Sequence, residues 1–68
     1  MKRDALIRDL RRYARNNNLD FELFKRKGNG SHYLVKVGDK LTTIQYGELD
    51  PFKVKRICEQ LNIDPARL

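Results

Sequence analysis

The sequence has few of the residues that hold small folds together covalently or through a metal. It contains one cysteine, one histidine and no tryptophan. A single cysteine, Cys58, excludes an internal disulfide, and one cysteine with one histidine cannot supply the four ligands of a structural zinc site. This cysteine usage is typical of a reducing compartment, and we predict a cytoplasmic protein.

Long apolar runs are also missing. No segment approaches the roughly 18 apolar residues that a membrane span needs. Asp4, Arg8 and Asp9 interrupt the stretch that would have to be the apolar region of a signal peptide. The sequence therefore predicts a protein without a membrane association.

Acidic residues are scarce relative to basic ones. Nine Asp and Glu stand against 15 Lys and Arg, which gives a formal net charge of +6. Ten of the 15 cationic residues lie between positions 1 and 36. Such an excess favours a polyanionic partner, and nucleic acid is the natural class. The alternative is a charged face that is merely solvated.

What is present is a periodic pattern of apolar residues over 68 positions, enough for one small domain, residues 1–68. Three- and four-residue spacing predicts two amphipathic helices. Their apolar stripes are Leu6, Ile7, Leu10, Tyr13 and Ala14 in the first helix, and Val54, Ile57, Cys58 and Leu61 in the second.

Between the helices the pattern predicts three strands. Glycine-containing turns separate runs rich in β-branched and aromatic residues, and Asp50-Pro51 provides an N-cap and a first helical residue for the second helix. We predict an α+β fold of order α-β-β-β-α, with a three-stranded antiparallel sheet and both helices on one face. The expected elements are a helix from Asp4 to about Asn16, strands at Phe21–Arg26, Ser31–Val37 and Leu41–Tyr46, and a helix from Pro51 to near Asn62.

The short turn at Gly38-Asp39 predicts the register of the last two strands. A two-residue loop places His32 opposite Gln45 and Tyr33 opposite Ile44. His32 then lies on the face that the helices leave open, together with Leu34, Lys36, Leu41, Thr43 and Gln45, whereas Tyr33 and Tyr46 are expected in the core. A four-residue loop at 27–30 would set Lys25 opposite His32, and a one-residue bulge would break that pairing.

His32 is the residue best suited to proton transfer. Histidine is the side-chain type that changes charge near neutral pH, and this chain has only one. It follows a glycine turn and a basic run, where backbone N–H groups and cations can contact phosphate. We expect no metal or other cofactor, because no carboxylate cluster has ligand spacing. The predicted RNA-binding residues are Lys25, Arg26, Lys27, Gly28, Gly30, Ser31 and Lys36.

The block from Lys27 to Tyr33, which contains the triplet Gly30-Ser31-His32, together with the helix segment from Val54 to Ile63, resembles the HicA family of toxins. The resemblance covers nearly the whole chain. It implies a fold like a double-stranded-RNA-binding domain and an mRNA interferase, an endoribonuclease that cleaves mRNA. The family's catalytic histidine carries over onto His32, which is expected to act as general base without a metal.

The resemblance also implies a type II toxin–antitoxin pair, in which an acidic HicB-type antitoxin covers His32. Two departures stand out: Gln45-Tyr46 replaces a pair that often contains a second histidine, and Asp50-Pro51-Phe52 replaces a frequent Gly-Thr-Leu segment. Two alternatives remain open. One is a non-catalytic RNA-binding module that uses the same basic face, and the other is a basic adaptor that binds an acidic protein.

Overall fold

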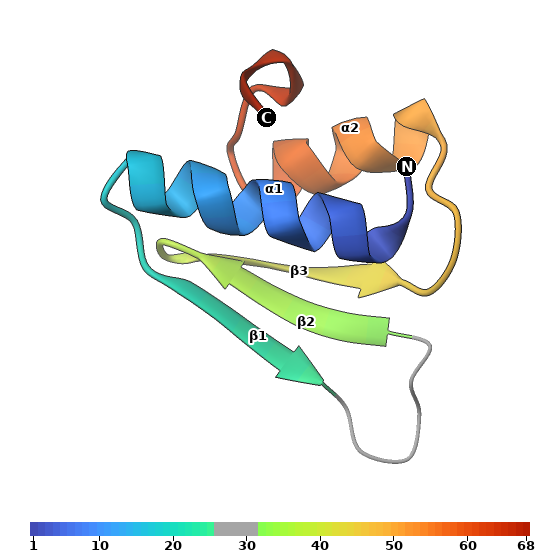
Figure 1. The fold of residues 1–68 in the computed structure, drawn as a ribbon, viewed down its shortest axis with the longest axis horizontal. Helices are drawn as coiled ribbons and strands as arrows, with labels where there is room; N and C mark the ends of the chain where they lie inside the picture. Colours follow the sequence, from blue (N-terminus) through green and yellow to red (C-terminus); the bar gives the residue numbers. More distant parts are fainter. Residues whose placement is uncertain (26–31) are drawn as a thin grey trace.

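The computed structural model describes residues 1–25 and 32–68, which form an α+β fold in the predicted order α-β-β-β-α (Figure 1). Within that part of the chain, no helix combines the length and the apolar character needed to cross a membrane. The elements are α1 (Arg3–Asn16), β1 (Phe21–Lys25), β2 (His32–Val37), β3 (Lys40–Gln45), α2 (Pro51–Gln60) and a final 3-10 turn, η1 (Pro65–Arg67).

The three strands form an antiparallel sheet in the order β1-β2-β3. The predicted β2–β3 register is confirmed, with His32 opposite Gln45 and Tyr33 opposite Ile44. It is set by the tight turn after β2, where Gly38 adopts a φ of +63° that most residues avoid.

Lys25 does not pair with His32, as a four-residue loop would have required. Lys25 lies opposite Tyr33, one position away. Because successive side chains of a strand point to opposite faces, this shift moves Lys25 to the face of the sheet that His32 does not share.

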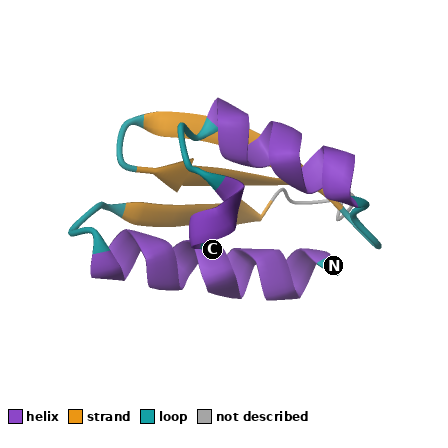
Figure 2. Ribbon diagram, turned by 90° about the horizontal axis from the view of Figure 1, so that it is seen from above, coloured by secondary structure: helices purple, strands orange, loops and turns teal. Residues whose placement is uncertain are grey.

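Both helices lie above the sheet in Figure 1, α1 packed over β1 and α2 over β3, as Figure 2 shows from above. The two predicted apolar stripes supply much of the core, and only Tyr13 and Val54 remain partly exposed. The buried apolar residues are Leu6, Ile7, Leu10, Ala14, Val35, Val37, Ile44, Leu49, Ile57, Cys58, Leu61 and Ile63.

Local signals fix the bounds and the docking of α2. The Asp50 carboxylate accepts a hydrogen bond of 2.8 Å from the Lys53 backbone N–H, and Pro51 opens the helix. Beyond the C-terminal end Asn62 takes a φ of +59°, consistent with the predicted stop. The Thr42 hydroxyl donates to the Gln60 side-chain oxygen, which ties α2 to β3.

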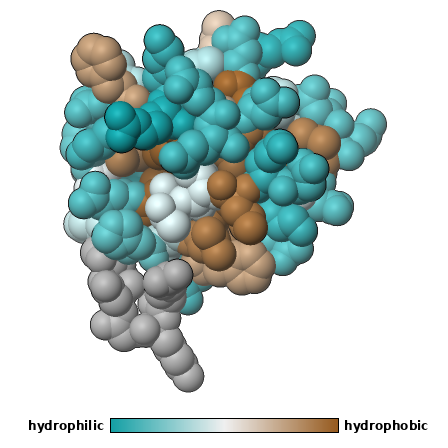
Figure 3. All heavy atoms as spheres, turned by 180° about the vertical axis from the view of Figure 1, so that it is seen from behind, coloured by the Kyte–Doolittle hydropathy of each residue, from teal (hydrophilic) through white to brown (hydrophobic). Residues whose placement is uncertain are grey.

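The face of the sheet away from the helices exposes apolar side chains. Phe24 and Leu41 are 43% and 53% exposed, and Leu34 is half-buried between them and their neighbours. Figure 3, which looks at the molecule from behind, shows such an apolar area among hydrophilic side chains. The two leucines that the register predicted for this face therefore do lie in contact with solvent.

Tyr46 is not a core residue, contrary to the prediction. It is 71% exposed because β3 ends at Gln45, and the chain turns at Gly47 with a φ of +101°. The Arg3 guanidinium carbon lies 3.6 Å from the centroid of the Tyr33 ring and 4.9 Å from that of Tyr46. Because side chains alternate between the two faces of a strand, Tyr46 was predicted to point into the core. Arg3 is buried against the Tyr33 ring instead.

Cys58 is fully buried on α2, and burial raises the pKa of its thiol above the ordinary value of 9.0, with a smaller contribution from Asp64. The thiolate is the reactive form. We therefore expect a thiol-alkylating reagent to modify the folded protein slowly and the urea-unfolded protein rapidly, which mass spectrometry would measure. The free energy of unfolding should also fall as the pH rises from the ordinary thiol pKa through the raised one, because the Cys58 thiol ionises more easily in the unfolded chain. Equal rates of alkylation in both states would contradict this assignment.

Candidate functional site

His32 opens β2 on the face of the sheet that the helices leave uncovered. Its side chain is exposed, as the sequence predicted. The histidine lines a shallow cavity of about 280 Å³ where the sheet meets α2. The cavity is lined by His32 from β2, Thr43 and Gln45 from β3, Leu49 from the following loop, and Lys53, Arg56, Ile57 and Gln60 from α2.

The positive charge in this cavity comes from α2. Lys53 and Arg56 are exposed and lie three positions apart on the helix, so they project from neighbouring parts of one surface. The capping bond from Asp50 to the Lys53 backbone fixes the helical turn that carries them. Two cations and an imidazole around one hollow favour an anionic ligand whose charge lies close to His32.

The surroundings of these side chains are mixed. Thr43 and Gln45 contribute neutral hydrogen-bonding groups, and Leu49 and Ile57 are buried residues at the base. A hydroxyl and an amide can hold a polar substrate in register without neutralising its charge. The cavity therefore combines a candidate proton acceptor, two cations and neutral polar groups over an apolar base.

The predicted RNA-binding residues are only partly brought to His32. Lys36 shares its face of the sheet but lies four residues along the same strand, about 13 Å away. It stands opposite Glu22 of β1, whose charge offsets its own. Lys25 lies on the other face. The remaining predictions, Arg26, Lys27, Gly28, Gly30 and Ser31, fall outside the described residues.

Sequence reasoning missed Lys53 and Arg56 as site residues, because charged residues on an amphipathic helix do not by themselves indicate a site. Their spacing, continued by Gln60, is a visible polar stripe in the sequence. The sequence does not show that this polar stripe lies beside the start of β2. That placement depends on how α2 packs against the β3 edge.

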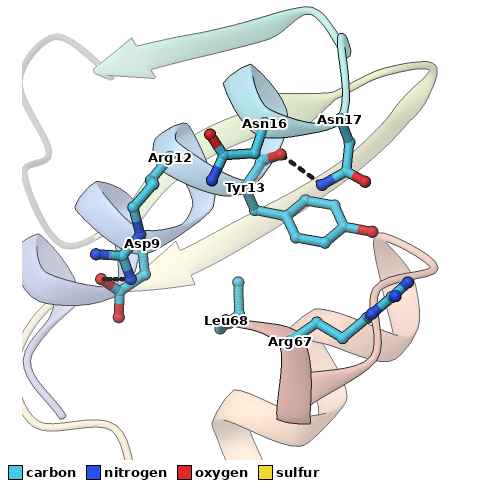
Figure 4. Close-up of a pocket in the computed structure, with 7 residues that line it drawn as sticks. All are labelled: Asp9, Arg12, Tyr13, Asn16, Asn17, Arg67 and Leu68. Atoms are coloured by element: carbon cyan, nitrogen blue, oxygen red, sulfur yellow. Dashed lines mark hydrogen bonds and ion pairs between the residues drawn. The ribbon is translucent and has the colours of Figure 1, made fainter.

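A second cavity, of about 240 Å³, lies between α1 and the C-terminal segment (Figure 4). Asp9 is buried there and contacts Arg12 at 3.2 Å, and Arg8 at 3.4 Å. Asn17 donates to the Tyr13 carbonyl, so its amide is also engaged. The Asp9 carboxylate already pairs with the guanidinium groups of Arg8 and Arg12. The charged groups of this cavity therefore have a structural role, and we do not assign it a ligand.

Within residues 1–25 and 32–68, no three His, Cys, Asp or Glu side chains gather to hold a metal ion. Comparisons with protein-family models, with curated proteins and with solved structures return no match to this chain.

Proposed function

We propose that this protein is a cytoplasmic endoribonuclease toxin of the HicA type that cleaves mRNA with His32 as general base. The observation that carries the proposal is the exposed imidazole in a cavity that Lys53 and Arg56 also line. A phosphodiester group placed there meets a proton acceptor and two cations at once. The net charge of +6 favours RNA as the substrate class.

In the proposed reaction His32 removes the proton from a ribose 2′-hydroxyl. The 2′-oxygen then forms a bond to the adjacent phosphorus, and the bond from phosphorus to the 5′-oxygen breaks. The products are a 2′,3′-cyclic phosphate and a 5′-hydroxyl end, with water supplying the proton of the leaving oxygen. Lys53 and Arg56 stabilise the extra negative charge on the phosphorane, which is the largest contribution expected from such a site.

The α-β-β-β-α order is compatible with a fold like that of double-stranded-RNA-binding domains, and we include that relationship in the proposal. A basic ribonuclease of this kind has to be restrained in the cell. We propose an acidic HicB-type antitoxin as its partner, seated over the exposed face that carries His32. The apolar side chains of Phe24 and Leu41 on the same face would add buried area to that contact.

The direct test is incubation of the purified protein with an RNA transcript in the presence of EDTA. Fragments with 2′,3′-cyclic phosphate and 5′-hydroxyl ends are expected, because the proposed reaction needs no metal. Cleavage that occurs only when a divalent metal is added would contradict the mechanism. Complete absence of cleavage, with RNA still bound, would reject the enzyme.

The second candidate is a non-catalytic RNA-binding module that uses the same surface. It is favoured by one observation: among the described residues that line the cavity, His32 is the only histidine and none is an aspartate or glutamate that could act as a second acid or base. A module would bind RNA with an affinity that falls steeply with salt and would release no fragments at any protein concentration.

Arg56 and Lys55 form a matched pair for testing the cavity. They are adjacent on α2, both are exposed and cationic, and only Arg56 lines the cavity. Arg56→Gln is expected to lower the RNA cleavage rate by about 10-fold or more through lost transition-state stabilisation, whereas Lys55→Gln changes it little. Cleavage rates under single-turnover conditions give the comparison. Equal effects of the two substitutions would mean that net charge alone matters.

A further inference from the structure

The face of the sheet opposite His32 carries a second cationic surface, in a cleft between α1 and β1. This α1–β1 cleft has a volume of about 360 Å³. Among the described residues, four cationic side chains line it, together with a single carboxylate, that of Asp4. The lining consists of Arg3, Asp4, Ile7, Arg8 and Arg11 from α1, Leu23 and Lys25 from β1, and Tyr33 from β2.

Aromatic rings lie against three of these cations. The Lys25 ammonium lies 5.6 Å from the Tyr33 ring centroid, and the Arg11 guanidinium lies 5.2 Å from that of Phe21. Arg3 stacks on Tyr33 from the α1 side. A cation over a ring face keeps its positive charge, so its N–H groups can still bind an anion.

Carboxylates neutralise little of this charge. Within residues 1–25 and 32–68, Arg11 and Lys25 form no salt bridge, and Asp9 is shared between Arg8, inside the cleft, and Arg12, outside it. The cleft thus presents a preorganised positive surface at a fixed place. Cations from two elements, α1 and β1, suit a chain of phosphates better than a single one.

The position of the cleft relates it to the proposed cleavage site. His32 and Tyr33 are neighbours at the start of β2 and point to opposite faces of the sheet, while Lys25 stands opposite Tyr33 at the end of β1. The cleft and the His32 cavity therefore adjoin the same end of the sheet, one on each face.

From this placement we infer that the α1–β1 cleft is a second RNA-binding site, which holds the phosphate backbone of a single strand whose scissile phosphate lies at His32. This inference rests on the proposed function. The cleft supplies affinity and direction to the strand, and Arg8, Arg11 and Lys25 are its phosphate contacts. None of them touches the reacting atoms.

The test measures binding of a single-stranded RNA oligonucleotide to the full chain carrying His32→Ala, so that the RNA stays intact. Arg8→Gln with Arg11→Gln is compared with Arg12→Gln and Arg15→Gln. Each pair removes two guanidinium groups from α1, one of them a partner of Asp9, but only the first pair lines the cleft. The first pair is expected to weaken binding about 10-fold. It should also reduce the slope of the logarithm of the binding constant against the logarithm of the salt concentration by about 1.4, the value for two single-strand phosphate contacts. The second pair should change binding much less.

Lys25→Gln, from β1, tests the same cleft without altering a helix, and should weaken binding in the same direction. Circular dichroism confirms that each variant is folded. If the two arginine pairs weaken RNA binding equally, or if Lys25→Gln has no effect, the cleft is not a site. If polyglutamate displaces the bound oligonucleotide as well as RNA of equal charge does, the α1–β1 cleft is a site for an acidic protein, and the inference is overturned. If the His32→Ala parent does not bind RNA at all, the proposed function fails together with the cleft.

Discussion

His32→Ala is expected to lower RNA cleavage by about 10²–10⁴-fold, the range that a positioned general base contributes. Binding of RNA should change little, because the cations that line the cavity and the cleft stay in place. In cells, inducible expression of the parent should arrest growth and fragment transcripts, and the variant should do neither. Growth curves and transcript integrity, followed together, give the measurement.

Leu41→Ala is the control for this experiment. Leu41 lies on the same face of the sheet as His32, is 53% exposed and does not line the cavity. It should leave cleavage and toxicity intact. If His32→Ala remains as toxic and as active on RNA as the parent, the imidazole is not the base.

Leu10→Ala is expected to leave much of the protein unfolded at 25 °C. Leu10 is completely buried in the core, and such a truncation costs about 2–5 kcal/mol of unfolding free energy. A core of this size rarely supplies more than about 3–5 kcal/mol. Urea denaturation followed by circular dichroism would measure the loss as a lower midpoint or as the absence of a folded baseline.

The same substitution at an exposed position separates the effect of burial from the effect of replacing leucine by alanine. Leu41→Ala removes the same atoms from a side chain that is already half in water, and it should shift the urea midpoint only slightly. A Leu10→Ala protein as stable as Leu41→Ala would contradict the placement of Leu10 in the core.

Where the sequence pattern was local, it predicted the structure well. The Leu6–Leu10 and Ile57–Leu61 spacings predicted two buried stripes, and the two-residue turn at Gly38 predicted which residues of β2 and β3 share a face. Turn length and helical period are fixed by residues a few positions apart, so they can be read from the chain.

Where an answer depended on distant contacts, the sequence predicted less. The β1–β2 register differs by one residue from the expected one, and that single step moved Lys25 from the side of His32 to the α1–β1 cleft. Tyr46 lies outside the core because β3 ends at Gln45, and Arg3, 43 residues earlier, packs against Tyr33 instead. Neither outcome follows from spacing within one segment.

The sequence by itself determined the order of the elements, the apolar stripes that both helices bury, the charge and the exposed position of its one histidine. Only the tertiary structure decided which cations accompany that histidine. Lys53 and Arg56 reach the His32 cavity because α2 packs along the β3 edge, while Arg8, Arg11 and Lys25 gather on the other face because α1 packs over β1. Charges far apart in a chain become neighbours only through packing, and packing minimises exposed apolar surface without reference to where the charges fall.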